Sequence, residues 1–462
     1  MKNQVQQETC EIPRLYHTVP PPKGVEATES RGIQGFAEFY PEAPIEVGLL
    51  TGGSDKPYAL GLSMALASKS VYLDFIGSDE LDSPELRATP NLRFLNLRGD
   101  QRDDASLAAK IRRISLYYAR LIRYASVTET RIFHILWNNR FEALDRTLLM
   151  LYYKLQGKKI AFTAHNVNAS KRDGSDSLVN RLTLRIQYHL ADHIFVHTEK
   201  MKRDLCEMFN IRESAVTVIP FGINNTVPNT DLTSAGAKQR LGIADGERTI
   251  LFFGRIGPYK GLEILIQAFQ QITAQHGNYR LVIVGSPKKG AADYLREIQR
   301  KIDRDIQPGR IIQKIEFVRD EDTELYFKAA DVLILPYTSI FQSGVLYLGY
   351  GFGLPVIASD VGSMREEIIE GRTGFLCKPC DAADLARVID KYFESELFKN
   401  LDTRRQSVRD YANTHHSWDV VGDMTKTVYA KLVANRSPRE SNSQPYTESN
   451  SGSIPHTRDS SR

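Results

Sequence analysis

Short apolar runs alternate along most of this chain with longer stretches whose apolar residues recur every three to four positions. The short runs are rich in β-branched residues and predict buried strands, and the longer stretches predict amphipathic helices. The expected strands lie at 45–50, 71–76, 132–136, 160–163, 193–197, 216–219, 249–253, 280–284, 314–318, 332–335 and 355–357. Regular alternation of strands and helices is typical of parallel sheets covered on both faces, so the predicted fold class is α/β.

The strand pattern pauses once, in a Thr-, Pro-, Asp- and Gly-rich segment that ends near Asp245. This pause predicts a hinge between two Rossmann-like lobes, 44–220 and 221–415, followed by an amphipathic helix over 416–435. Ligands of open α/β sheets bind beyond the carboxyl ends of the strands, so two facing lobes predict an interdomain cleft.

The two ends of the chain differ from this pattern. Residues 1–43 are polar and irregular, with three consecutive prolines, and 436–462 contain two large apolar residues among Ser, Asn, Arg and Pro. Neither segment can bury enough apolar surface to offset the entropy of ordering, so both are expected to be disordered.

Composition narrows the possible partners and the compartment. Lys and Arg total 60 against 56 Asp and Glu, a net charge of +4, so any affinity for phosphate must come from local clusters, and a nucleic-acid partner is disfavoured. The four cysteines indicate reduced thiols, and Cys377 and Cys380 are interpreted as loop thiols. No apolar leader and no run of 18 apolar residues occurs. A cytoplasmic protein is expected.

Two cations follow the expected strand 249–253 in the sequence GRIGPYKG. Arg255 and Lys260 lie five positions apart and are flanked by glycines that let a ligand approach the backbone. A guanidinium grips phosphate oxygens with two hydrogen bonds and an ammonium acts as a point charge, so the pair suits adjacent phosphoryl groups.

A second anion-binding feature follows the expected strand 332–335. Ser343 is placed to cap a helix, which leaves the amides of Gly344 and Val345 without acceptors inside it. A helix start of this kind attracts anions through these amides and the helix dipole. Together with Arg255 and Lys260, it predicts a diphosphate site.

The stretch from about 250 to 385 resembles the nucleotide-sugar domain of GT-B glycosyltransferases of the family 4, or group 1, type. Its matching segments are FFGRIGPYKGLEILIQAF, LVIVGSP, FVRDEDTELYFKAADVLILPY, QSGVLYLGYGFGLPVIASDVGSMREEI and GRTGFLC. The resemblance implies transfer of a sugar from a nucleoside diphosphate sugar to an acceptor hydroxyl, with no metal and no further cofactor. It implies that the donor diphosphate lies on Arg255, Lys260, Gln342, Ser343, Gly344 and Val345, and that Gly254 and Gly285 line the nucleotide pocket.

The first lobe matches the family through LLTGG and FTAHNVN. His165 in the second of these segments is similar to the family's cleft histidine, which implies that it orients the sugar or accepts the proton of the acceptor. Gly52 and Gly53 resemble the glycine-rich loop that reaches donor or acceptor. The region around Trp418 resembles the start of the family's last helix, which crosses back to the first lobe.

The sequence departs from the family at two positions. Family members usually carry glutamates where this chain has Ile340 and Leu348, so the roles of those acids cannot be transferred. Three interpretations stay open at this point: Gln342 or Ser343 contacts the donor instead, the stereochemical course differs, or the protein binds a nucleotide sugar without turning it over. A GT-B epimerase shares the fold and is a further alternative.

The segment 110–124 carries cations interleaved with aromatic residues. A helix there would present Lys110, Arg113, Tyr117, Arg120 and Tyr124 on one face, beside an apolar face of Ile111, Ile114, Tyr118 and Leu121. Such a face suits the headgroups of an anionic bilayer, and a solvated lobe helix would look the same. The membrane interpretation places the protein at the inner face of the plasma membrane. It points to a lipid-linked or glycan acceptor in surface polysaccharide or glycolipid synthesis.

Overall fold

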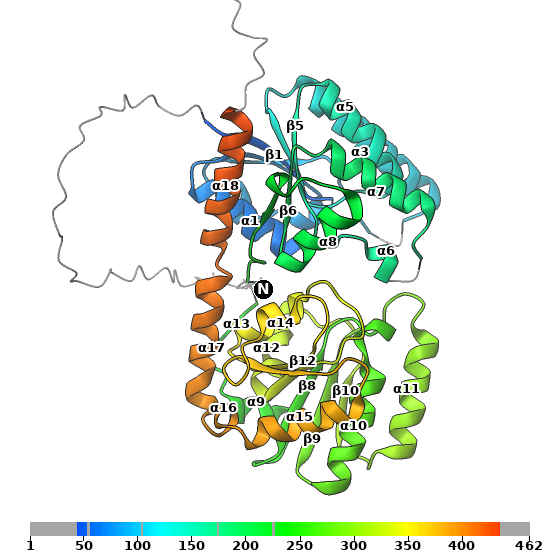
Figure 1. The fold of residues 1–462 in the computed structure, drawn as a ribbon, viewed down its shortest axis with the longest axis vertical. Coiled ribbons are helices and arrows are strands. Elements are labelled where there is room, and N and C mark those ends of the chain that lie inside the picture. Colours follow the sequence, from blue (N-terminus) through cyan, green and yellow to red (C-terminus); the bar gives the residue numbers. More distant parts are fainter. Residues whose placement is uncertain (1–43, 53–55, 103–104, 173–174, 224–226, 435–462) are drawn as a thin grey trace, which may run out of the picture. The chain divides into compact units, whose positions relative to one another are not determined.

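The computed structural model describes residues 44–52, 56–102, 105–172, 175–223 and 227–434. The expectations for 1–43 and 436–462 therefore fall outside the described residues. In the described part, strands and helices alternate, and all strand pairs are parallel (Figure 1). The predicted α/β class with two Rossmann-like lobes is confirmed.

The first sheet has seven strands among the described residues, in the order β3-β2-β1-β4-β5-β6-β7. These are β1 (Glu46–Leu50), β2 (Tyr72–Gly77), β3 (Leu92–Asn96), β4 (Ile132–Ile135), β5 (Lys159–Thr163), β6 (His193–Val196) and β7 (Val216–Val218). One face is covered by α3 (Leu107–Val127), α5 (Met150–Leu155), α7 (Leu178–Leu190) and α8 (Glu199–Phe209). The other face is covered by α1 (Lys56–Ser68) and α18 (Trp418–Ala434). This lobe also contains the short elements α2 (Pro84–Ala88), α4 (Glu142–Leu144), the π-helical turn Asp145–Leu149 and α6 (Ala169–Arg172).

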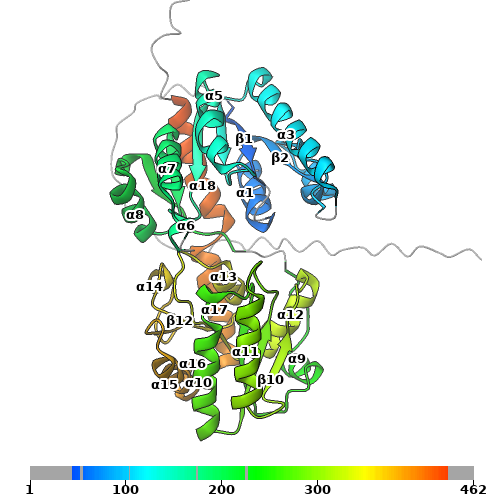
Figure 2. The same cartoon turned by 90° about the vertical axis from the view of Figure 1, so that its right-hand side faces the viewer.

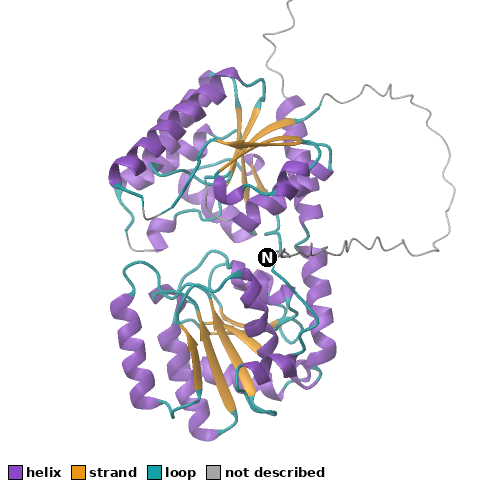
Figure 3. Cartoon of the chain, turned by 180° about the vertical axis from the view of Figure 1, so that it is seen from behind, coloured by secondary structure: helices purple, strands orange, loops and turns teal. Residues whose placement is uncertain are grey.

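The second sheet has six described strands in the order β10-β9-β8-β11-β12-β13. These are β8 (Arg248–Phe253), β9 (Tyr279–Val284), β10 (Ile311–Lys314), β11 (Val332–Leu335), β12 (Val356–Ser359) and β13 (Gly374–Cys377). One face packs on α10 (Leu262–Gln275), α11 (Ala292–Asp305), α15 (Ala382–Glu394) and α16 (Glu396–Lys399). The other packs on α9 (Ser234–Arg240), α12 (Asp320–Ala329), α13 (Gly344–Gly351), α14 (Met364–Glu367) and α17 (Leu401–His415). Helices thus enclose the strands of each sheet (Figure 3), with α10 and α11 side by side (Figure 2).

The strand expected at 314–318 is wrong, because the structure places β10 at Ile311–Lys314 and leaves Phe317 exposed. In the alternating sequence IIQKIEFV either half can form an edge strand, and pairing with β9 selects the first half. Edge strand β3 was not predicted from the sequence, since its residues are only partly buried and carry a weak apolar pattern.

Helix α18 packs on α1, and polar contacts anchor it at both ends. The ammonium of Lys69 lies 2.7 Å from the carboxylates of both Asp419 and Asp423. At the other end, the Tyr429 hydroxyl lies 2.5 Å from Nδ1 of His134, deep in the first lobe. The last described helix is thereby tied to the sheet that begins the fold.

Helix α3 differs from the expectation for 110–124. Tyr117 and Tyr124, which the pattern placed on the basic face, are buried, and their hydroxyls donate hydrogen bonds to Asn139 (2.6 Å) and Asp74 (2.7 Å). These tyrosines cannot contact a lipid surface, because a partner for each hydroxyl lies inside the lobe. Among the described residues, no helix combines the length and the apolar character that crossing a membrane requires.

Candidate active site

The loop that carries Lys260 is pressed against the loop that follows β11. Gly261 has φ +65, and a Cβ at this position would lie 1.9 Å from the carbonyl oxygen of Pro336. The amide of Thr338 donates a 3.0 Å hydrogen bond to the carbonyl of Tyr259. Only glycine permits both the left-handed backbone and this close approach. The loop that carries Lys260 and the loop that follows β11, both predicted to bind phosphate and far apart in sequence, are therefore in contact.

Lys260 is a buried lysine, with 6% of its surface exposed. Its ammonium lies 3.9 Å from the centre of the Tyr337 ring and 5.4 Å from that of Tyr259. The electron-rich ring face attracts the cation. The Tyr337 hydroxyl is in turn 3.1 Å from Oγ of Ser343. One buried tyrosine thus links the lysine to the residue that precedes α13.

Helix α13 starts at Gly344, and Ser343 occupies the N-cap position. The predicted position is found, but the expected side-chain cap is not, because the Ser343 hydroxyl contacts Tyr337 and accepts no hydrogen bond from the helix. The first amides of a helix have no acceptor within it. A Cβ added at Gly344 would meet no atom within 4 Å, so this helix start faces open space.

These groups line a cavity of about 390 Å³. From the second lobe its wall includes Lys260, Gln342, Ser343, Gly344 and Val345. The wall also includes Tyr58 and Asn166 from the first lobe, Phe221 and Gly222 from the segment after β7, and Trp418 at the start of α18. Five of the six residues predicted to hold a diphosphate are therefore gathered in one place. Their roles stay predictions.

Arg255 is the exception. It is exposed and is not part of the wall of this cavity. It directly follows Gly254, where a Cβ would lie 3.2 Å from Cγ2 of Val345 at the start of α13. Arg255 is thus anchored next to the helix start while its own side chain lies outside the cavity.

Gly254 and Gly285, the predicted nucleotide-pocket residues, lie against each other at the ends of β8 and β9. Their φ values are +107 and +142, and a Cβ on Gly285 would lie 1.8 Å from the Gly254 carbonyl oxygen. Neither residue lines the 390 Å³ cavity. Their observed contribution is to let two strand ends come together.

Ile340 and Leu348, the positions at which the resemblance implies glutamates, both line the cavity. The wall is therefore apolar at these two points. The Gln342 amide donates a 2.7 Å hydrogen bond to the hydroxyl of buried Tyr347, which orients Gln342 within the wall.

His165 follows β5 and lines a second cavity of about 210 Å³, whose wall shares Asn166 with the first. Its imidazole stacks on Trp137, with ring centres 4.3 Å apart and planes 3° from parallel, and meets Tyr58 edge-on at 4.7 Å. Burial, with a smaller effect of His197, holds the pKa of His165 well below its usual value. The ring is therefore neutral near pH 7.

A short hydrogen-bond chain sets the tautomer of His165. Nδ1 of His197 lies 3.3 Å from the carbonyl oxygen of Ile219, so this nitrogen carries hydrogen and donates. Burial lowers the pKa of His197 to about 4, and the Nε2 of its neutral ring accepts from Nδ1 of His165 at 3.1 Å. Nε2 of His165 is left as a lone-pair acceptor, with no hydrogen-bond partner among the described residues.

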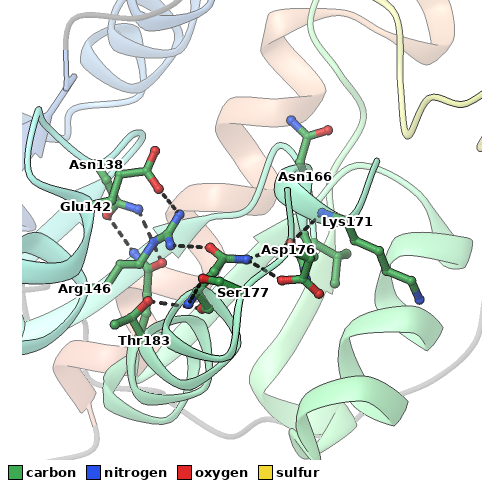
Figure 4. A network of polar contacts seen from close by, with 12 residues as sticks. Asn138, Glu142, Arg146, Asn166, Lys171, Asp176, Ser177 and Thr183 are labelled. Carbon is green, nitrogen blue, oxygen red and sulfur yellow. Dashed lines mark hydrogen bonds and ion pairs between the residues drawn. The ribbon is translucent and has the colours of Figure 1, made fainter. Parts of the chain in front are cut away.

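Residues joined by polar contacts between α4 and α7 also line this second cavity (Figure 4). The Arg146 guanidinium lies 2.5 Å from the Glu142 carboxylate and donates to Asn180 at 2.8 Å. The buried amide of Gln187 donates to Asn138 at 2.7 Å. These bonds hold this part of the cavity wall in one arrangement.

Gly52 follows β1 with φ +60, and a Cβ there would lie 2.3 Å from the carbonyl oxygen of Trp137. It lines a third cavity, of about 500 Å³. Gly53 lies outside the described residues. The first glycine thus lets the ends of β1 and β4 close up beside a cavity.

Sequence reasoning missed the aromatic groups that shape these cavities. Tyr58, Trp137 and His197 lie outside the segments that resemble the family, and Tyr337 ends one of those segments without a predicted role, so only the fold reveals their contacts. Trp418 had a signal, and its indole nitrogen donates to the carbonyl of Ile223 at 2.8 Å. Within the described chain, no group of three or more His, Cys, Asp or Glu side chains could hold a metal ion.

Comparison with known proteins identifies the family of this chain. Residues 235–414 match the family model described as glycosyl transferases group 1, and residues 58–226 match that of glycosyltransferase family 4. An uncharacterized glycosyltransferase of Methanocaldococcus jannaschii is 28% identical over 50% of this chain and 58% of its own length. A D-inositol 3-phosphate glycosyltransferase of Corynebacterium aurimucosum is 23% identical over 60% of this chain and 66% of its own length. The matched regions thus span less than two thirds of these two relatives.

Solved structures share the fold over most of both chains. Sucrose-phosphate synthase from Thermosynechococcus elongatus has a TM-score of 0.67, at 19% identity, over 84% of this chain and 99% of that one. HepE of Anabaena, crystallised with UDP and glucose, has a TM-score of 0.65, at 18% identity, over 84% and 100%. The two family models together account for more than half of the chain, and both lobes match, so the predicted family is confirmed. The chain belongs to the group 1, or family 4, glycosyltransferases and has their two-lobed GT-B fold.

Proposed function

We propose that this protein transfers a sugar from a nucleoside diphosphate sugar to the hydroxyl of an acceptor. The main support for the proposal is that Lys260 and the first residues of α13 line the same cavity. Support comes from the structural neighbours, because HepE was solved with UDP and glucose and a starch synthase of Arabidopsis thaliana with ADP and acarbose. A hexose is the sugar we expect.

Negative charge grows on the leaving diphosphate as the bond to the sugar breaks. A buried ammonium and helix amides already aimed at that position stabilise this charge without reorganisation. We expect Arg255, which follows Gly254 beside Val345, to reach the same oxygens from the exposed side. These groups supply the positive charge that a divalent metal would bring. We therefore propose that transfer needs no metal, and that EDTA leaves the rate unchanged.

A screen of UDP-, GDP- and ADP-sugars tests the donor assignment. A ligand that binds the folded state raises the melting temperature, so the true donor class should give the largest shift. Incubation with the labelled donor should then show hydrolysis or transfer. A thermal shift without either reaction identifies a binding subunit, the interpretation favoured by Ile340 and Leu348. No shift with any donor contradicts the proposal.

His165 is expected to orient a sugar hydroxyl, with Nε2 as hydrogen-bond acceptor. A general base works best with a pKa near the working pH, and burial has moved the pKa of His165 well below that. Protonation of His165 sets in only as the pH falls to this lowered pKa, so the profile of kcat/KM from about pH 6 to 8 should show no inflection from it.

Replacing His165 with alanine should lower kcat/KM about tenfold, the effect of one lost hydrogen bond, because a substrate hydroxyl loses its acceptor. His276→Ala, at an exposed position of the second lobe, is the control. A wild-type rate that rises with pH through a single pKa between about 6 and 7, and becomes flat in His165→Ala, would instead assign His165 as the base.

We further propose that the first lobe works at an anionic membrane, on a lipid-linked acceptor in surface polysaccharide or glycolipid synthesis. The support is a set of exposed apolar side chains on helices of one face of the first lobe: Leu107, Ile111, Leu155, Leu178 and Leu182. Exposed cations accompany them on α3, among them Arg120 and Arg123. Apolar side chains beside cations suit the boundary between headgroups and acyl chains.

Vesicle flotation tests the membrane assignment. The protein should float with phosphatidylserine-containing vesicles and remain at the bottom with phosphatidylcholine alone. Each surface cation contributes roughly 1 kcal/mol to such binding, so the double variant Arg120→Gln, Arg123→Gln should bind at least tenfold more weakly. Arg300→Gln, on the second lobe, is the matched control. Equal flotation with both kinds of vesicle, or none, would contradict the assignment.

A further inference from the structure

We propose that the third cavity, beside Gly52, is an acceptor subsite that binds a phosphoryl group. This inference rests on the proposed function, which requires an acceptor in the first lobe, and it names the chemical class of that acceptor. The cavity shares Asn138 and Glu142 with the wall that also holds His165, so it continues the predicted acceptor region.

The position of the cavity is that of a ligand site in a parallel sheet. Its lining comes from segments that follow the carboxyl ends of three strands: Gly52 after β1, Arg98 and Gln101 after β3, and Asn138 and Asn139 after β4. Strand ends at this edge are where open α/β sheets bind substrates. Helix α3 closes the remaining side with Arg113.

The described lining of the cavity contains more cations than carboxylates. Of the described residues that line the cavity, Arg98, Lys110, Arg113 and Arg140 are cations, and Glu142 is the one carboxylate. The Glu142 carboxylate is already engaged, 2.5 Å from Arg146 on the side of the second cavity. The lining is therefore positive overall, which favours an anionic ligand.

Two arginines in this lining have buried guanidinium nitrogens that donate no hydrogen bond to the described residues. Nη1 of Arg98 and Nε of Arg113 are buried and have no hydrogen-bond partner among the described residues. Leaving a buried charged donor unsatisfied is costly, which indicates that a ligand completes the site. Other atoms of both side chains are held: Arg98 lies over the Tyr117 ring at 5.2 Å, and Arg113 donates to the carbonyl of Arg102 at 3.3 Å. The guanidinium groups of Arg98 and Arg113 are thus already held in place for a ligand.

The ligand class follows from this donor set. A phosphoryl group offers three or more oxygens and up to two negative charges, which suits two guanidinium forks with further cations around them. The carboxylates of Asp145 and Asp100 interact electrostatically with Arg98 and Arg113 and offset part of the charge of this cationic lining, and a neutral sugar would leave the rest uncompensated. The exposed side chains of Leu107 and Ile111 also line the cavity and offer an apolar surface to the rest of the acceptor.

Isothermal titration with inorganic phosphate tests the subsite without any turnover. Arg98→Gln and Arg113→Gln should each weaken phosphate binding by about tenfold or more, since each removes a charge-assisted donor. Arg140→Gln, at an exposed position, should weaken binding without affecting the fold. Arg112→Gln, exposed on the same helix and outside the lining, is the control and should bind like the wild type.

A donor-site variant separates this inference from the proposed function. Phosphate binding that persists in Lys260→Ala and is lost in Arg98→Gln and Arg113→Gln supports the subsite. Binding that is lost in Lys260→Ala but unchanged in the arginine variants shows that the anion occupies the donor cavity, which overturns the inference and leaves the proposed function standing. Absence of phosphate binding in the wild type also overturns it.

Two further experiments identify the kind of molecule that supplies the phosphoryl group. One titrates a soluble hexose phosphate, and the other compares phosphatidylcholine vesicles with and without a polyprenyl phosphate. A preference for either probe that disappears in Arg113→Gln supports the subsite and names its source. Capture of either probe to the same extent by wild type and Arg113→Gln would overturn it.

Discussion

Replacing Lys260 with methionine is expected to lower kcat about 10²- to 10³-fold, the usual effect of losing one preorganised donor to developing charge. Methionine keeps an unbranched apolar stem that is one atom shorter, so most of the space is still filled while the ammonium and its approach to the Tyr337 ring are lost. Among the described residues that line the cavity, no buried cation then remains to meet the proposed leaving diphosphate. Initial rates of transfer from the labelled donor provide the measurement.

The control is Lys289→Met, in which an exposed lysine of the same lobe changes in the same way. Its rate should equal that of the wild type. Circular dichroism and the melting temperature should show that both variants fold. A Lys260→Met enzyme that turns over at the wild-type rate would remove Lys260 from the mechanism, and with it the main support for the donor site.

Replacing Gly344 with leucine is expected to reduce turnover by about 10²-fold or more and to leave the fold intact. A Cβ at this position meets nothing within 4 Å, so the side chain has room to extend into the cavity. There it would occupy the space in front of the first amides of α13, the proposed position of the diphosphate. Leucine also favours helix more than glycine by several tenths of a kcal/mol, so the melting temperature should stay level or rise.

The graded variant Gly344→Ala should lose less activity, because a methyl group fills less of the same space. Gly277→Leu, at an exposed position in the same lobe, should leave the rate unchanged. Donor binding measured by thermal shift should weaken in parallel with the rate of Gly344→Leu. Undiminished donor binding in this variant would show that the diphosphate lies elsewhere.

Much of the fold could be predicted from the sequence, because the apolar patterns that indicate strands and helices are local. Buried strands such as β11 and the central strand β8 are continuous apolar runs, and residues of such runs have few alternatives to a sheet interior. The two strands that were not predicted correctly both lie at sheet edges, although the edge strand β7 matches its prediction. β3 was missed and β10 was misplaced, since an edge strand is half-exposed and its register depends on a neighbour distant in sequence.

The candidate site divides in the same way. The pattern around Lys260 and Gly344 is contained in two short segments, so the sequence alone indicated an anion site and a family. It could not show that Tyr337 supports the lysine, that Arg255 lies outside the cavity wall, or that Tyr117 and Tyr124 point inward. Each of these depends on which side chains from separate segments come into contact.

By itself, then, the sequence determined the α/β class, the two lobes and the family, while the phosphate-binding role of the loops around Lys260 and Gly344 stays a prediction. Tertiary structure alone decided the tautomer of His165, through His197 and Ile219, and the cluster of guanidiniums beside Gly52. The reason is physical: strand and helix formation follow from periodicity within a few neighbours, whereas proton positions and cavity charge follow from contacts between residues that only folding brings together.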